Sequence, residues 1–471
     1  MTARESKGAS GIEALAKTVL AFDADAIPAS VLTQAKLLLL DTIGCGFAGV
    51  REEVAQAACA VALNMGGPLE CALIGRKAKT GMTNAVLANG AAIRVLDLND
   101  YLINESGGQP EAGGHPSDNI PVALAVGAAR RRTGRDILGA IVAGYEIYAR
   151  LQRLMDRSGQ WDGVTASGLV APAIAGRLMN LTEEQLAHAL ALGLARAPTP
   201  AVVRSGDISA AKSLSNALVA QSGVQAALLA EQGITGPLAI FEDARGLGSL
   251  FHNADLATLT AHLPPDGAIM RCHVKTYPCI NTGQAAVAAA LKLHAKLKDE
   301  IPNLIRIEVV MADYPVIQRQ QEDPGRIEPA SREAADHSFP FIVAVALTDG
   351  AFGVAQYENE RWRDPAITQL MGRIQMRRDA AWNARAPGAY PCTIRAVDGQ
   401  GQEHRVEVRT PPGFSHSGLD AGAVLEKFHA TVAPVLDSDA RKRIVDAVME
   451  FEHSSSSTRL DAAIAHEGTS N

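Results

Sequence analysis

Apolar residues recur at helical spacing along most of the chain. Between residues 11 and 63 the spacing predicts two or three helices, the clearest over Val31–Phe47, where Leu32, Ala35 and Leu39 share one face. This segment runs into DTIGCGFAG, whose glycines would let another helix approach closely. The same reasoning predicts helices at 82–95, 120–130, 136–154, 162–178, 182–195, 207–232, 282–297 and 338–347, and helical periodicity over 420–451. The chain is therefore predicted to be mainly α.

The pattern changes near residue 265, where LPPDG interrupts the helical spacing. Beyond it, Ile305–Met311 alternates and is rich in β-branched residues, as a strand is. Thr393–Val397 and Arg405–Thr410 flank VDGQGQE, a hairpin pattern. Residues 268–412 are thus predicted to form a smaller α+β unit.

These patterns together predict a large all-helical domain built from both chain ends and a smaller α+β domain. The predicted boundaries are 1–267 for the N-terminal part of the helical domain, 268–412 for the α+β domain, and 413–471 for helices that pack back on the first part. A cleft between two such domains is a common place for a ligand.

Composition narrows the classes of function. With 471 residues the chain is longer than one hydrophobic core usually supports, and 47% apolar with 20% charged residues is typical of a globular protein. A net charge of −7 provides no basic field, which argues against nucleic-acid binding. No run reaches the roughly 18 apolar residues of a membrane span, and the first residues lack the apolar core of a secretory signal, so a cytoplasmic location is expected. The six cysteines show no spacing suited to zinc or an iron–sulfur cluster.

Candidate chemistry is concentrated in Leu96–Pro121, a polar, Gly-rich stretch predicted to be a loop between two buried helices. His115 precedes Pro116, Ser117 and an apolar run, which is a helix-start pattern, and a helix N-terminus favours an anion. One histidine and several carboxylates beside an anion site indicate proton transfer on an acidic substrate. Spacing alone favours the plainer alternative, an acidic surface loop with ordinary capping residues.

Several motifs in order extend the interpretation, because they resemble the MmgE/PrpD family over about residues 10–460. They are DTIGCGFAG, LDLNDY, GGHPSDN, GYEIYARL, VKTYP and ADHSFPFIVAVALTDG. The family includes 2-methylcitrate dehydratase, cis-aconitate decarboxylase and iminodisuccinate epimerase, and HPSDN is most similar to the 2-methylcitrate dehydratase branch. The resemblance implies a helical domain with an α+β lid, a homodimer, and activity without a metal, flavin or nucleotide.

The resemblance also implies site residues. Asp97 and His115 match the acidic residue and the histidine of the family's first active-site segment, while Lys212 in AAKSLSN and Lys275 in VKTYP match two lysines. Asp336 and His337 fall in the segment that returns the lid over the site, although DHS is also a capping pattern for the helix that follows.

The roles follow from the chemistry of the implied substrate, a small di- or tricarboxylate. Lys212 and Lys275 would bind its carboxylates, and Arg204 would add a bidentate clamp, although a surface ion pair is its ordinary alternative. Tyr101 and His337 are further candidates for substrate contact. Loss of water needs a base for the C–H and an acid for the hydroxyl; Asp97 and His115 are the candidates, in an order that the sequence leaves open.

Four features depart from the family pattern. The stretch between Asp97 and His115 is lengthened by NESGGQPEAG; Tyr101 takes a place where the family often has Thr; and Asp162 stands where the decarboxylase branch has a histidine. CINT after Pro278 also lacks a histidine that several branches have. These differences argue most strongly against cis-aconitate decarboxylase.

The expected function is therefore a cofactor-independent, 2-methylcitrate dehydratase-like lyase. An isomerase, epimerase or decarboxylase on the same scaffold is the first alternative, and a non-catalytic metabolite-binding dimer is the second. The binding protein predicts no convergence of lysines on His115, so the position of Lys212 and Lys275 bears on that alternative.

Overall fold

The structure, a computed structural model, describes residues 9–106, 109–155, 160–248, 256–383, 390–415 and 418–466. It is mainly helical, as predicted, with three small sheets. The helices before residue 261 are α1 (Gly11–Leu20), α2 (Ala29–Gly49), α3 (Glu53–Met65), α4 (Met82–Arg94), α5 (Ile120–Ala129), α6 (Gly134–Leu154), α7 (Ser167–Met179), α8 (Glu183–Leu194), α9 (Ala211–Glu231) and α10 (Leu256–Thr260). Those after it are α11 (Gln284–Leu297), α12 (Pro315–Glu322), α13 (Pro324–Ile327), α14 (Arg332–Ala335), α15 (Phe339–Asp349), α16 (Pro365–Met371), α17 (Ala421–Val432), α18 (Ser438–Met449) and α19 (Thr458–Ile464).

The strands form three separate sheets. β1 (Cys71–Leu73) pairs with β2 (Arg76–Thr80), and β3 (Tyr101–Ser106) lies between β4 (Gln109–Gly114) and β5 (Cys272–His273). The third sheet has the order β7 (Ile374–Arg378), β6 (Leu304–Met311), β8 (Cys392–Asp398) and β9 (Glu403–Val408), with β6 and β7 parallel and the other pairs antiparallel. The predicted hairpin of residues 393–410 is confirmed as β8–β9.

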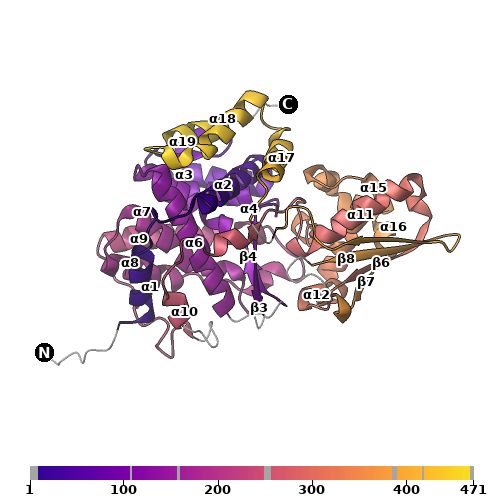
Figure 1. Cartoon of the computed structure of the whole chain (residues 1–471), viewed down its shortest axis with the longest axis horizontal. Coiled ribbons are helices and arrows are strands. Elements are labelled where there is room, and N and C mark those ends of the chain that lie inside the picture. The colour runs from indigo at the N-terminus through magenta and orange to yellow at the C-terminus, as the bar shows by residue number, and fades with distance from the viewer. Residues whose placement is uncertain are drawn as a thin grey trace.

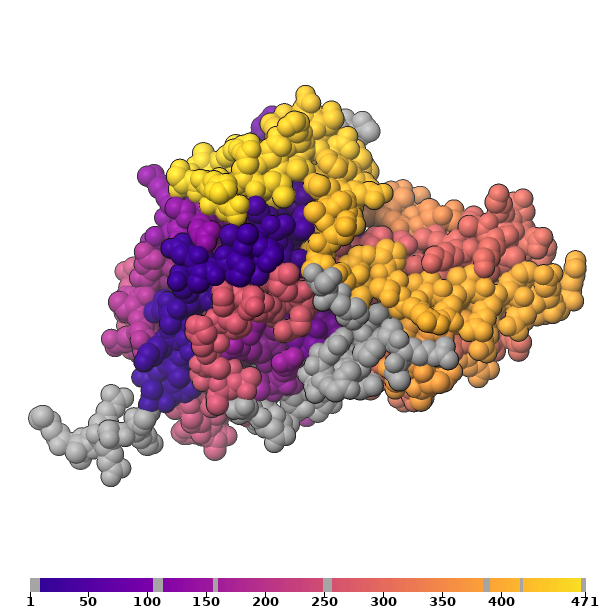
Figure 2. Space-filling model, in the orientation of Figure 1, coloured from indigo at the N-terminus to yellow at the C-terminus, as the bar shows by residue number. Residues whose placement is uncertain are grey.

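The two largest hydrophobic cores of the described residues hold most of these elements. The larger core combines α1, α2 and α4–α9 with α17–α19, so residues from both ends of the sequence share it: Leu39 and Ile43 of α2 belong to the same core as Phe428 and Val432 of α17. Figures 1 and 2 show the C-terminal helices lying along the N-terminal ones. We call α1–α10 with α17–α19 the helical unit.

The smaller core lies between the four-stranded sheet and α11 and α15, and it includes Ile307, Ile394 and Phe341. We call these elements, with α12 and α16, the sheet unit; Figure 1 shows it beside the helical unit. The boundaries 1–267, 268–412 and 413–471 stay a prediction, because the packing of elements does not test individual boundary residues.

The structure corrects the prediction at three places. Leu96–Pro121 contains the β3–β4 pair rather than only a loop, so the helical unit is not all helical; Tyr101, Leu102 and Ile103 are good strand formers that the Gly-, Pro- and Glu-rich neighbourhood hid. Residues 107–108 and the side chains of 105–112, within the expected insertion, lie outside the described part. Helix α9 begins at Ala211 rather than at residue 207.

The third correction concerns α2. It is 21 residues long and apolar enough in composition to span a membrane, which the absence of an unbroken apolar run does not predict. However, 89% of its apolar window is buried inside the protein, against α4, α17 and α18. α2 is therefore a central core helix in this structure.

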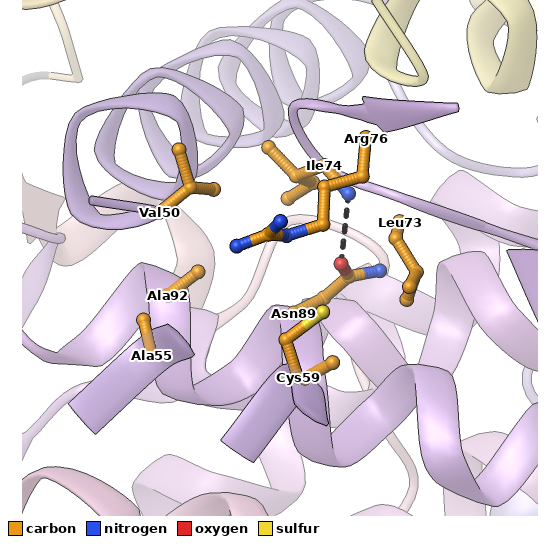
Figure 3. A pocket seen from close by; sticks show the side chains of 9 residues that line it. Val50, Ala55, Cys59, Leu73, Ile74, Arg76, Asn89 and Ala92 are labelled. Atoms are coloured by element: carbon orange, nitrogen blue, oxygen red, sulfur yellow. Dashed lines mark hydrogen bonds between the residues drawn. The ribbon is translucent and has the colours of Figure 1, made fainter. Parts of the chain in front are cut away.

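Local hydrogen bonds explain why the helices begin where they do. Thr182 accepts from the backbone N–H of Gln185, whose side chain accepts from the Thr182 N–H, and this reciprocal pair forms a capping box at the start of α8. Asn89 of α4 holds the chain beside β1, because its side chain accepts from the Ile74 N–H at 2.9 Å and donates to the Ala72 carbonyl at 3.0 Å. Figure 3 shows Asn89 and Ile74 beside a small pocket.

The glycines at the end of α2 permit close helix packing, as the sequence predicted. A Cβ added at Gly49 would stand 2.0 Å from the carbonyl oxygen of Ala92, and one at Gly46 would stand 2.8 Å from Ile74 Cδ1. The first neighbour is backbone of α4 and cannot rotate away, so Gly49 fixes the crossing of α2 and α4.

We therefore expect Gly49→Ala to lower the free energy of unfolding by about 2–3 kcal/mol, because α2 and α4 must separate. Urea denaturation measures the change. Gly372→Ala is the matched control: Gly372 has φ −63°, the nearest atom to an added Cβ lies at 3.6 Å, and a change within about 0.5 kcal/mol is expected. Equal midpoints for the two variants would contradict the tight crossing.

Candidate active site

Asp97 lies at the centre of a buried cluster of charges. It follows α4, and its backbone adopts a left-handed conformation with φ 49°, which turns the chain out of the helix. The side chain is 1% exposed. A buried carboxylate is costly unless cations and hydrogen bonds hold it, so its neighbours define the site.

Three cations surround the Asp97 carboxylate. Arg94 Nη1 donates to Oδ1 at 2.6 Å, Lys275 Nζ contacts the same oxygen, and Lys212 Nζ lies 3.4 Å from Oδ2. Arg94 comes from α4, Lys212 from the first turn of α9, and Lys275 from the segment after β5. Both lysines are at most 1% exposed. We call Asp97, Arg94, Lys212 and Lys275 the Asp97 cluster.

These contacts set the charge states. Burial raises the pKa of Asp97, but Arg94, Lys275 and Lys212 outweigh it, so the pKa lies well below its usual range. Burial lowers the pKa of Lys212 and of Lys275, while Asp336 and Asp97 oppose that effect. Asp97 is thus an ionised carboxylate at neutral pH.

Asp336 and His337 extend the cluster from the segment before α15. Lys212 Nζ donates to both oxygens of Asp336 at 2.7 Å, and His337 Nδ1 contacts Asp336 Oδ1 and lies 3.6 Å from Asp97 Oδ2. Burial and then Lys212 lower the pKa of His337 to about 3. A neutral His337 therefore donates its Nδ1–H to Asp336. The predicted capping role of DHS falls to Ser338 alone, which accepts from the Phe341 N–H.

His115 adjoins the cluster from the other side. Its Nδ1 lies 2.6 Å from the Asp100 carbonyl oxygen, and its Nε2 lies 3.7 Å from Asp97 Oδ1. A carbonyl only accepts, so Nδ1 carries the hydrogen. Burial, then Arg94 and Lys275, lower the pKa of His115 well below its usual range. His115 is therefore a neutral imidazole whose unprotonated Nε2 faces the Asp97 cluster.

The Asp100 carboxyl lies behind His115 and makes its own contacts. Oδ1 accepts from Ser117 Oγ at 2.5 Å, and Oδ2 accepts from the Tyr145 hydroxyl at 2.8 Å. Burial raises the pKa of Asp100 to about 7, even though both hydrogen bonds lower it. Asp100 is a buried titratable group beside the candidate base.

Arg204 and Tyr101 lie beside His115 rather than in the Asp97 cluster. Arg204 Nε pairs with Asp162 Oδ2 at 2.5 Å, so the alternative of a structural ion pair is realised, although its charge also lowers the pKa of His115. The Tyr101 ring meets the His115 ring edge-on, with centroids 5.1 Å apart. The structure thus brings together Asp97, His115, Lys212, Lys275 and His337, with Arg204 and Tyr101 at their border.

Sequence reasoning missed two residues of this arrangement. Arg94 is the strongest neutralising charge on Asp97 after burial, yet it reads as an ordinary residue of the last helical turn. Its position three residues before Asp97 was the available signal. Asp100 stood within LDLNDY, but its contacts with Ser117 and Tyr145 join segments that no local pattern connects.

One group of side chains has a spacing that could hold a metal ion. It consists of Asp97, Asp336 and His337, whose ligand atoms lie within 4.8 Å of one another. Their oxygens already accept from Lys212, Lys275 and Arg94. A divalent cation would have to approach three fixed positive charges. The cluster therefore suits the binding of an anion better than the binding of a metal ion.

Pockets elsewhere do not replace this cluster as a candidate site. The pocket in Figure 3, between Cys59, Arg76 and Asn89, has a volume of about 10 Å³, room for roughly one water molecule. A pocket of about 610 Å³ lies in the sheet unit beside His294 and Arg373. None of its lining residues belongs to the Asp97 cluster.

Comparison with known proteins identifies the family. Residues 13–259 match the MmgE/PrpD N-terminal domain, and residues 277–451 match the MmgE/PrpD C-terminal domain. The chain belongs to the MmgE/PrpD family. Two kinds of lyase are among the curated relatives of this MmgE/PrpD chain. This chain is 25% identical to the cis-aconitate decarboxylase-like protein oryM of Aspergillus oryzae, over 94% of both chains.

Two further relatives are similar at the same level. Cis-aconitate decarboxylase of Homo sapiens is 23% identical over 90% of this chain and 88% of that protein, and 2-methylcitrate dehydratase of Salmonella typhimurium is 25% identical over 88% of each. Because these identities are nearly equal to one another, they do not distinguish a dehydratase from a decarboxylase.

The charge balance around Asp97 leads to a test of stability. We expect Asp97→Asn to lower the free energy of unfolding by about 3–5 kcal/mol at neutral pH, because three buried cations lose their shared carboxylate. The low pKa of Asp97 means that its contribution is complete above the ordinary carboxyl pKa and is lost as the pH falls through the lower folded value. The deficit should therefore stay constant between about pH 5 and pH 8.

The double variant Asp97→Asn/Lys275→Met tests whether unpaired buried cations cause this loss of stability. Removing one cation together with the carboxylate should recover about 1–2 kcal/mol of the loss in urea denaturation. A double variant less stable than Asp97→Asn would show that Lys275 stabilises the fold independently of Asp97.

Proposed function

We propose that this chain is a cofactor-independent lyase, similar to 2-methylcitrate dehydratase, that removes water from a small hydroxy di- or tricarboxylate. The observation that carries the proposal is the unprotonated Nε2 of neutral His115 facing a cluster that contains Lys212 and Lys275. The alternative of a metabolite-binding protein predicts no convergence of these lysines beside a buried, neutral His115, so the arrangement counts against it. Membership of the family and the lyase relatives support the same class of reaction.

In the proposed reaction His115 is the base. Its Nε2 takes the proton from the carbon next to a substrate carboxylate, and the C–H electron pair moves into an enolate-like carboxylate. Lys212 and Lys275 stabilise that charge, and Arg204 binds a further carboxylate beside His115. Hydroxide leaves with a proton from one of the lysine ammonium groups, and the electron pair forms the new C=C bond.

The low pKa of Asp97 bears on which residue can supply the proton to the leaving hydroxyl. An ionised carboxylate has no proton to give, so Asp97 holds Lys212 and Lys275 in place rather than acting as the acid. His337 and Tyr101 border the same space and are proposed to contact the substrate.

Substrate access requires movement between the units. Lys212 contacts Asp336, and Lys275 contacts Asp97, so contacts of the cluster join the segment before α15 and the segment after β5 to the helical unit. A substrate carboxylate enters by exchanging with Asp97 or Asp336 as partner of these lysines. The expected homodimer and cytoplasmic location stay predictions.

The decisive assay follows the new double bond by ultraviolet absorbance with purified protein, EDTA, and a panel of 2-methylcitrate, citrate, malate derivatives and cis-aconitate. We expect absorbance to rise with a hydroxy acid, and His115→Gln to reduce the rate by about 10²–10⁴-fold because the general base is lost. His453→Gln, a substitution at a histidine whose side chain is 80% exposed, is the matched control and should retain full activity.

Other outcomes identify the alternatives. Carbon dioxide released from cis-aconitate would indicate a decarboxylase, and deuterium uptake from solvent without a change in absorbance would indicate an isomerase or epimerase. Tight binding of a panel member with no reaction of any kind would favour the metabolite-binding protein.

The pH dependence of kcat/KM tests the charge state of His115. Because its pKa is depressed, Nε2 stays unprotonated through mildly acidic pH, and kcat/KM should not fall between about pH 7.5 and pH 6. Lys275→Met removes one of the charges that lower this pKa, so its acid limb should move to higher pH, whatever the loss in absolute rate. An acid limb at the ordinary histidine pKa in the unmodified protein would contradict the neutral base.

A further inference from the structure

We propose that Asp100 is the positioning residue of His115: its backbone carbonyl fixes the His115 tautomer, and its side chain anchors that carbonyl to η1 (Pro116–Asn119) and α6. The inference rests on the proposed function only in taking His115 as the base. Nothing in the family resemblance or in the comparisons assigns Asp100 a role.

The first observation is that both nitrogens of the imidazole lie beside one short segment, which holds the ring through a hydrogen bond to Nδ1. Asp97 Oδ1 lies 3.7 Å from Nε2, and the Asp100 carbonyl oxygen lies 2.6 Å from Nδ1. Because the two residues are three apart in the sequence, the orientation of the ring depends on the conformation of residues 97–100. A rotation of the Asp100 carbonyl would release Nδ1 and turn Nε2 away from the cluster.

The second observation is that the Asp100 side chain is tied to two further elements. Ser117 of η1 donates its hydroxyl at 2.5 Å and its backbone N–H at 3.3 Å to Oδ1, while Tyr145 of α6 donates its hydroxyl to Oδ2. Asn99 in turn donates to Ser117 Oγ at 2.8 Å. The carboxyl thus crosslinks the segment before β3, the turn after His115, and a core helix.

α6 supports His115 a second time. The Tyr148 hydroxyl, one turn after Tyr145, accepts from the backbone N–H of His115 at 3.1 Å. Two tyrosines on one face of α6 therefore fix the backbone of His115 and the side chain of Asp100 relative to the same helix. Rigid second contacts of this kind are what keep a catalytic side chain in its productive orientation.

A carboxyl is the group that fits this position. Ser117 and Tyr145 both arrive as hydroxyl donors on opposite oxygens, and the nitrogen of an amide cannot accept from either. The titratable groups that interact electrostatically with Asp100 are Asp41, which is paired with Lys427, together with Asp118, Cys45, Cys272 and Tyr145. The side chain is fully buried, so its hydrogen bonds are not exchanged for water.

The contact also has a chemical advantage. A carboxylate on Nδ1 would favour the imidazolium and raise the pKa of His115, whereas a carbonyl fixes the tautomer without adding a full negative charge. Asp100 therefore orients His115 without opposing the burial and positive charges that keep the ring neutral. The two carboxylate residues thus have different roles. Asp100 orients His115 through its backbone carbonyl, and Asp97 holds the two lysines.

The test compares Asp100→Asn with the unmodified protein by ¹⁵N NMR of the histidine rings, with His115 assigned from the spectrum of His115→Gln. In the unmodified protein we expect a protonated Nδ1 and an unprotonated Nε2 at neutral pH. In Asp100→Asn one hydroxyl loses its acceptor, and the two tautomers should mix. This readout needs no substrate, so it holds even if the proposed reaction is wrong.

Kinetics provide the second readout. We expect Asp100→Asn to lower kcat about 10- to 100-fold while KM changes less than about twofold, because the base is misplaced but the cations are intact. Tyr145→Phe and Ser117→Ala should each give a smaller loss in the same direction. Tyr357→Phe removes another buried hydroxyl, one that donates to the Pro278 carbonyl at 2.7 Å in the sheet unit, and should leave the His115 spectrum unchanged.

A single protonated Nδ1 in Asp100→Asn with undiminished kcat would overturn the proposal. If Asp100→Asn does not fold, Tyr145→Phe decides: mixed tautomers support the positioning role, and an unaltered His115 spectrum refutes it. Loss of activity in all variants with an unchanged spectrum would also refute it, because the effect would not pass through His115.

Discussion

The rest of the structure depends on the neutralisation of Asp97. A carboxylate this deeply buried is tolerated only because three cations reach it, and those cations come from α4, α9 and the segment after β5. The ends of α4 and the start of α9 must therefore meet at one point, and the segment that enters the sheet unit must return to it. Lys212 then carries the network on to Asp336, before α15. The charge cluster is a packing constraint as well as a candidate site, since moving any one element leaves a buried charge without its partner.

The same cations shape the two histidines. His115 and His337 both have neighbouring carboxylates that favour the charged ring, yet burial and nearby positive charges lower the pKa of each. The result is two neutral imidazoles in a site full of ions. Hydrogen bonds to Nδ1 come from different acceptors, a backbone carbonyl for His115 and a carboxylate for His337, so the two rings are not equivalent. The Nε2 atom of His115 lies 3.7 Å from Asp97 Oδ1, and the His115 ring meets the Tyr101 ring edge-on.

Much of this could be predicted from the sequence, and the failures have physical causes. Helix spacing gave α2, α4 and α8 because each buries a continuous apolar face, and Gly49 could be assigned a packing role before its neighbours were known. Asp97 and His115 lie in the polar stretch Leu96–Pro121, but Lys212 and Lys275 could be joined to them only through the resemblance, because these segments share no local pattern. The β3–β4 pair was missed since Gly, Pro and Glu conceal its strand residues, and β5, which completes that sheet, lies far along the chain. Arg94 and Asp100 were missed because a buried ion pair and a buried carboxyl look like ordinary surface residues in sequence.

The packing of α17 on α2 has a consequence for synthesis on the ribosome. Phe428 and Val432 complete the core around Gly44 and Leu39, so that core cannot close while the chain is shorter than α17. In the core of the sheet unit, by contrast, the described buried residues run from Cys279 to Val408, so all of them emerge before α17. A nascent chain thus carries the part of α2 that packs on α17 and α18 uncovered during most of translation, the period in which such surfaces bind chaperones or aggregate. The order of folding is set by the order of synthesis: the unit encoded in the middle can form first, and the unit that begins the chain is finished last.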